Sequence, residues 1–147
     1  MTQLHISSSF DSGAIEVLSV TDPGDIRLNI RADNASEFAQ WFHFCLHGAA
    51  RLPVTMRFLN AGQCAYPKGW VDYRVVASYD RQHWFRISTD FDGQIMVATL
   101  TPETDCVYFA YFEPYSHERH LDLIGSAAAS EHVRVRRLGA TLDGRDM

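Results

Sequence analysis

Hydrophobic and polar residues alternate along most of the chain, which is the pattern of strands with one buried face. The clearest cases are residues 26–30, with Ile, Leu and Ile at every second position, and residues 54–59, with Val, Met and Phe. Turn-forming residues separate such segments at intervals of about 8 to 12 residues. Further strands are expected at residues 4–6, 14–20, 38–46, 74–79, 83–87 and 94–100. The pattern predicts a mostly β fold, an antiparallel β-sandwich of about eight or nine strands.

A run of apolar and aromatic residues at 107–112 differs from the others because it leaves no polar face. A strand of this kind is expected to be covered on both sides. Pro114 ends the strand because it has no N–H to donate, and Ser116 is a suitable N-cap for a following helix. That helix is predicted from His117 to about Ala128, with one apolar face formed by Leu121, Ile124 and Ala128.

Composition places the chain among soluble globular domains. It has 147 residues, of which 46% are hydrophobic and 21% charged, enough for one domain with a core. The net charge of -5 argues against nucleic-acid and anionic-membrane partners. The start of the chain does not resemble a secretion signal, and no apolar run is long enough to cross a membrane. A cytoplasmic location is therefore expected.

The three cysteines, Cys45, Cys64 and Cys106, are odd in number and far apart in the sequence. This spacing disfavours a disulfide framework. Cys64 is expected in a loop with Lys68 as its one nearby cation, which is weak support for a reactive thiol.

Histidine pairs are the first candidates for a metal site. His43 and His47 lie on a predicted strand, where four residues span about 13 Å, so the two cannot share an ion. His117 and His120 are closer, in the first turn of the predicted helix, but no third ligand is evident. We therefore expect neither pair to hold a metal.

Catalytic motifs are not recognisable either. Glu118 and Asp122 resemble paired carboxylates, but their i, i+4 spacing is typical of the solvated face of a helix. The sequence contains no Gly-x-Ser-x-Gly elbow and no glycine-rich phosphate loop after a strand. We expect no catalytic, cofactor-binding or metal-binding residue in this chain.

Aromatic residues gather in the predicted loops and hairpins between residues 66 and 91. Flat rings on a β-sandwich can stack on sugars, so a free-standing carbohydrate-binding module using Trp70, Tyr73 and Trp84 is one alternative. Packing beneath the loops is the favoured explanation. The residues concerned are Tyr66, Trp70, Tyr73, Trp84 and Phe91.

The end of the chain contains a second turn signature. Residues 131–138 alternate Val with Arg, which predicts a strand, and Leu142-Asp-Gly-Arg145 is typical of a hairpin turn. Only Arg145, Asp146 and Met147 remain after this turn, and three residues are too few to pair with that strand. We expect the natural chain to continue into another domain; a frayed natural terminus is the alternative.

Three stretches together resemble a known family. They are Gln40-Trp-Phe-His-Phe ahead of Gly48, Phe109-Ala-Tyr-Phe-Glu-Pro-Tyr-Ser with Arg119-His-Leu-Asp-Leu-Ile, and Leu138-Gly-Ala-Thr-Leu-Asp-Gly-Arg-Asp. In motif order they are similar to the N-terminal domain of zinc carboxypeptidases of the cytosolic carboxypeptidase type. The resemblance implies a β-sandwich that precedes an α/β catalytic domain, whose zinc-binding His-x-x-Glu and later His would follow this sequence.

The resemblance implies a non-catalytic accessory domain in residues 1–129, followed by a linker strand and the start of a truncated catalytic domain in residues 130–147. Its partners would be its own catalytic domain and, through the parent enzyme, peptide or protein substrates that lose C-terminal residues. Zinc is expected in the parent catalytic domain alone, so the 147-residue chain should be inactive and hold no stoichiometric zinc. A protein-interaction module without a ligand of its own is the remaining alternative.

Overall fold

The computed structural model describes residues 3–147. These residues form ten strands, two short 3-10 helices and one α-helix. The 3-10 helices are η1 (Ala61–Gln63) and η2 (Pro67–Trp70), and the α-helix is α1 (His117–Ala128). The strands are β1 (His5–Ser7), β2 (Glu16–Ser19), β3 (Ile26–Asn29), β4 (His43–His47), β5 (Val54–Phe58), β6 (Val76–Ser78), β7 (Phe85–Arg86), β8 (Ser88–Phe91), β9 (Met96–Leu100) and β10 (Cys106–Ala110).

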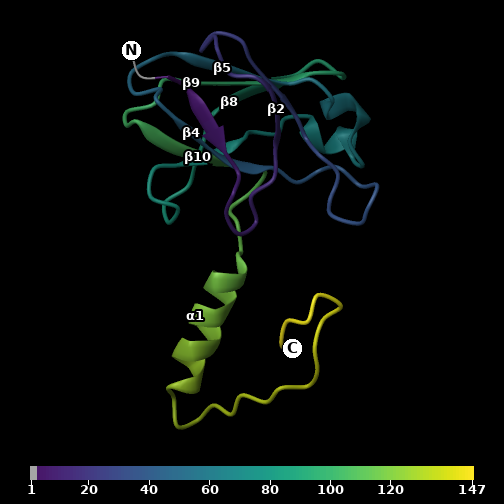
Figure 1. Ribbon diagram of the computed structural model, residues 1–147, viewed down its shortest axis with the longest axis vertical. Helices are drawn as coiled ribbons and strands as arrows, with labels where there is room; N and C mark the ends of the chain where they lie inside the picture. Colours follow the sequence, from purple (N-terminus) through teal and green to yellow (C-terminus); the bar gives the residue numbers. More distant parts are fainter. Residues whose placement is uncertain (1–2) are drawn as a thin grey trace. The chain divides into compact units, whose positions relative to one another are not determined.

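The strands form two five-stranded sheets, which confirms the predicted β-sandwich (Figure 1). The first sheet has the order β1-β4-β10-β6-β7, and the second has the order β2-β3-β5-β9-β8. All pairs are antiparallel except β3 with β5, which are parallel. This exception arises because the chain between β3 and β5 crosses to the first sheet to form β4 before it returns.

The core lies between the two sheets and is rich in aromatic rings. Phe42 and Phe44, next to and within β4, are fully buried, and the ring of Phe42 lies 4.8 Å from that of Phe58 on β5. Phe44 also packs against Phe109 of β10, with ring centroids 5.3 Å apart. These residues join the two sheets into one hydrophobic cluster.

Strand β10 lies in the middle of the first sheet, between β4 and β6. Val107 and Phe109 point into the core, with no exposed surface. On the opposite face Tyr108 is half-buried beneath Arg81, whose guanidinium carbon lies 5.4 Å from the ring centroid. Both faces of the strand are therefore covered, as its composition predicts.

The chain divides into two compact units, one that ends at Pro114 and one that begins at Tyr115. In the second unit α1 has the predicted limits, and the Ser116 hydroxyl accepts a hydrogen bond from the backbone N–H of Arg119. The predicted strand at residues 131–138 is wrong: this segment has no regular structure and no ladder partner among residues 3–147. The predicted turn at residues 142–145 does form. The residues on its two sides pair with each other through the bridge between Ala140 and Asp146.

None of the helices in residues 3–147 combines the length and the apolar character that a membrane span requires.

Candidate functional site

The outer face of the first sheet, turned away from the core, brings two cysteines and a histidine together. In the antiparallel ladder of β4 and β10, Cys106 lies opposite His47 and Tyr108 lies opposite Cys45. Alternation along each strand sends Leu46 and Val107 into the core, so the side chains on either side of them face outward. Cys45 and Cys106 therefore occupy diagonal positions on neighbouring strands, next to the imidazole of His47.

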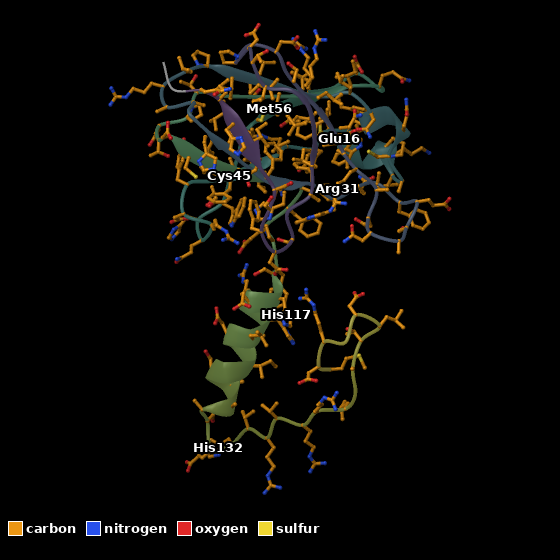
Figure 2. The ribbon with its side chains drawn as sticks, in the orientation of Figure 1. Glu16, Arg31, Cys45, Met56, His117 and His132 are labelled. Atoms are coloured by element: carbon orange, nitrogen blue, oxygen red, sulfur yellow. The ribbon has the colours of Figure 1, made fainter. Side chains whose placement is uncertain are left out.

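The distances within this group are short. The Sγ atoms of Cys45 and Cys106 are 3.0 Å apart. One ligand atom from each of Cys45, His47 and Cys106 lies within 4.8 Å of the other two, and no other such group of three occurs among the residues that the structure describes. Cys45 is buried, whereas His47 and Cys106 are half-buried and reachable from solvent. Figure 2 labels Cys45 on this face of the sheet.

Burial controls the protonation of the Cys45 thiol. Its pKa is raised above the ordinary cysteine value, first by burial and then by the hydrogen bond with Cys106. The thiol is therefore neutral at physiological pH, and it stays so unless a cation replaces the proton.

A second cluster on the same face surrounds His43. Its Nδ1 atom lies 3.0 Å from the Ser12 hydroxyl, while its buried Nε2 atom has no hydrogen-bond partner. Burial lowers the pKa of His43 to about 4, with a further contribution from Arg81. The neighbouring rings, at edge-on or tilted angles, are Phe10, Trp41, Trp84 and Tyr108. His43 is thus a neutral, packed side chain.

The two histidine pairs considered from the sequence have different surroundings in the structure. His43 faces its aromatic cluster, and His47 joins the two cysteines instead. The rings of His117 and His120 are stacked, with centroids 6.5 Å apart, and the described residues supply no third ligand there.

The other candidate side chains are the Glu118–Asp122 pair and Cys64. Glu118 and Asp122 are both exposed on α1, as expected for a solvated helix face. Cys64 is buried; its thiol donates to the Asn60 carbonyl oxygen at 3.5 Å, and burial raises its pKa to about 11. Neither feature is that of a reactive thiol or an acid–base pair.

The aromatic residues of the loops differ in their burial. Trp70, one of the rings in the carbohydrate-binding alternative, is only 1% exposed and donates from Nε1 to the Ala61 carbonyl oxygen. Tyr73 packs against Trp70 and donates to the Tyr111 carbonyl oxygen. Trp84 is half-buried against His43. Packing, the favoured interpretation, is confirmed for Trp70 and Tyr73 but is wrong for Tyr66, whose ring is 60% exposed.

The second unit leaves most of its large apolar side chains exposed, as judged from residues 3–147. Not one residue from Tyr115 to Met147 is buried, and this includes all twelve residues of α1. Its large apolar side chains are exposed by 41% or more, except Ile124, which is half-buried. The exposed ones are Tyr115, Leu121, Leu123, Val133, Val135, Leu138, Leu142 and Met147.

The first unit is a β-sandwich, and the second is a helical segment with no buried residue. The comparisons with known proteins identify the family that has this fold. A profile of the cytosolic carboxypeptidase N-terminal domain matches residues 6–112. The chain belongs to this family.

Relatives of the chain extend beyond it. It is 52% identical to a metallo-carboxypeptidase from Burkholderia cenocepacia, with a TM-score of 0.96 over 99% of this chain. It is 45% identical to a metallo-carboxypeptidase from Pseudomonas aeruginosa, solved in complex with (2-guanidinoethylmercapto)succinic acid, with a TM-score of 0.92 over 97% of this chain. An uncharacterized protein of Zymomonas mobilis is 42% identical over 98% of this chain. The chain spans 38% of the length of each of the three, at the N-terminal part.

Proposed function

We propose that this chain is the non-catalytic N-terminal accessory domain of a cytoplasmic zinc carboxypeptidase that removes C-terminal residues from peptides or proteins. In this role the chain docks on the catalytic domain and supports its fold. The family match supports the proposal, and so do two similar structures described as metallo-carboxypeptidases, of which the chain spans 38%.

The uncovered second unit is the observation that carries the docking role. Twelve residues are too few to make a stable helix in water by propensity alone, so α1 depends on packing against something else. Its apolar residues, such as Leu121, are exposed. Because monomeric proteins rarely leave apolar side chains grouped in this way, the natural cover for them is the catalytic domain.

The accessory domain proper would comprise residues 1–129, the sandwich with its closing helix, and residues 130–147 would lead into the catalytic domain. In this arrangement the exposed valines of residues 131–138 gain the ladder partner that they lack among the described residues. The catalytic zinc, its ligands and the substrate-binding groups would all belong to the catalytic domain. The 147-residue chain alone would not cleave peptides.

The test uses the native protein from its source cells and full-length variants made from its gene. An intact mass well above 16.7 kDa is expected. In the full-length enzyme, Leu121→Asp and Leu138→Asp should each lower the thermal midpoint and the carboxypeptidase activity, because a charge would replace an apolar side chain at the interface. A buried leucine contributes about 1.5 to 3 kcal/mol, so the loss should be large.

The matched control is Phe38→Asp, which replaces an exposed ring of the first unit with a charged side chain. This variant should change neither the thermal midpoint nor the carboxypeptidase activity. A native mass of 16.7 kDa would remove the catalytic partner and contradict the proposal. Leucine variants that behave like the control would contradict the docking role.

A further inference from the structure

We propose that Cys45, His47 and Cys106 form a binding site for Zn²⁺ on the outer face of the first sheet. The proposal replaces our expectation from the sequence that this chain holds no zinc, and it does not depend on the proposed function. Its basis is the convergence of two sulfur atoms and one imidazole nitrogen within 4.8 Å of one another.

The ligand chemistry favours Zn²⁺ over the harder cations. Thiolate and imidazole are the ligands that zinc takes in proteins, whereas Ca²⁺ and Mg²⁺ require oxygen atoms. No carboxylate belongs to this group of three. Two cysteines and one histidine leave a fourth tetrahedral position, which a water molecule would occupy because His47 and Cys106 are half-exposed.

The strand register favours a metal over a disulfide. Cys45 and Cys106 are diagonal neighbours in the ladder, not direct partners. Diagonal positions have Cβ atoms somewhat less than about 7 to 8 Å apart, whereas a disulfide requires about 3.5 to 4.5 Å. Two thiolates on one tetrahedral zinc lie about 3.8 Å apart, given Zn–S bonds of about 2.3 Å. The sulfur atoms, 3.0 Å apart, would have to separate by about 0.8 Å to reach that value.

The backbone holds these ligands in place before any metal arrives. β4 and β10 are paired over their full five-residue length, and Leu46 and Val107 fix both strands to the core. The ring of His5 on β1 stacks on that of His47, with centroids 6.0 Å apart, and limits its rotation. A site on paired strands therefore needs little reorganisation to bind.

Binding exchanges protons for the metal. As each Zn–S bond forms, the thiol of Cys45 or Cys106 gives its proton to solvent, and His47 donates the lone pair of a neutral ring nitrogen. One Zn²⁺ thus replaces two protons, and no oxidation occurs. The bound ion would link β4 to β10 and hold the centre of the first sheet together.

The test is metal binding by the 147-residue chain in a metal-free, reducing buffer. Titration calorimetry with Zn²⁺ should give one ion per chain and a higher thermal midpoint. Co²⁺ as a probe should produce sulfur-to-cobalt charge-transfer absorption and the visible bands of a tetrahedral site. Both signals should disappear in Cys106→Ala, and the affinity should fall by more than about tenfold in His47→Gln.

Cys64→Ser is the matched control, because it removes the third cysteine, which lies outside the group. This variant should bind Zn²⁺ like the wild type. Circular dichroism of Cys106→Ala and His47→Gln should show a folded sandwich, since both side chains are half-exposed. Absence of binding by the reduced wild type, binding that survives in Cys106→Ala, or a Cys45–Cys106 disulfide in place of metal binding would each overturn the proposal.

Discussion

Removing the ring of Phe109 should be among the most damaging single substitutions in the first unit. Phe109 lies on β10 in the middle of the first sheet, has no exposed surface, and packs against Phe44 with ring centroids 5.3 Å apart. Its backbone pairs with β4 on one side and β6 on the other. Alanine at this position would keep the backbone pairing and leave a cavity where both sheets meet.

The cost combines two effects. Burial of a phenylalanine side chain stabilises the folded state by about 1.5 to 3 kcal/mol relative to exposure. The cavity adds to the loss because close-packed neighbours relax only in part, so Phe109→Ala should cost about 3 to 5 kcal/mol. Since domains are stable by only about 5 to 15 kcal/mol, this is a large fraction of the total.

Urea unfolding followed by tryptophan fluorescence measures this loss. All three tryptophans lie before Pro114, so the signal reports on the first unit alone. With slopes of about 1 to 3 kcal/mol per molar urea, the unfolding midpoint should fall by at least about 1 M. Phe38→Ala, which removes a ring that is 61% exposed, should change the free energy of unfolding by less than about 0.5 kcal/mol.

Equal losses in the two variants would contradict this prediction, because they would mean that burial of the ring does not determine the loss of stability. A Phe109→Ala loss below about 1 kcal/mol would show that the two sheets do not meet at this ring, since such a loss lies well under the range for buried rings.

Three further predictions concern α1 and the third cysteine. Gly125→Ala should raise the helix content of α1 and stabilise the helix by about 1 kcal/mol, because the added Cβ meets no atom within 4 Å. Ser116→Ala should destabilise the helix by about 1 kcal/mol, because it removes the N-cap. Amide exchange along α1 measures both, and a lower helix content in Gly125→Ala would contradict the description of an open helix surface. Iodoacetamide at about pH 8 should label Cys64 about 100-fold more slowly in the folded chain than in urea, because a pKa near 11 lowers the thiolate fraction by that factor. Equal rates, read by peptide mass spectrometry, would show that the thiol is open to solvent.

Local pattern predicted the sandwich because alternation and turn chemistry are properties of short segments. Residues 26–29 and 54–58 are strands close to where the sequence placed them, and the helix from His117 has the expected cap. Residues 131–138 have the same kind of alternation but form no strand. A ladder needs a partner as well as a pattern, and the residues that the structure describes offer none to this segment.

The hydrophobic pattern did not predict the order of the strands in each sheet. For this reason it also did not predict the group formed by Cys45, His47 and Cys106. The sequence places Cys45 and Cys106 61 positions apart, and only the pairing of β4 with β10 brings their sulfur atoms together. The available signal was that each cysteine directly precedes a core-facing residue of an apolar strand, Leu46 or Val107, which predicts outward-facing thiols. That β10 would pair with β4 and not with another strand depends on the fold as a whole.

The central place of the last strand also affects how the chain is made. Translation produces β1, β4, β6 and β7 before β10, although β10 separates β4 from β6 in the finished sheet. Until residue 110 leaves the ribosome, β4 and β6 each present an unpaired edge, and the ring of Phe44 lacks its contact with Phe109. The nascent polypeptide is therefore most vulnerable to edge-to-edge association shortly before this unit is complete, and that is the interval in which a chaperone would be of most use to it.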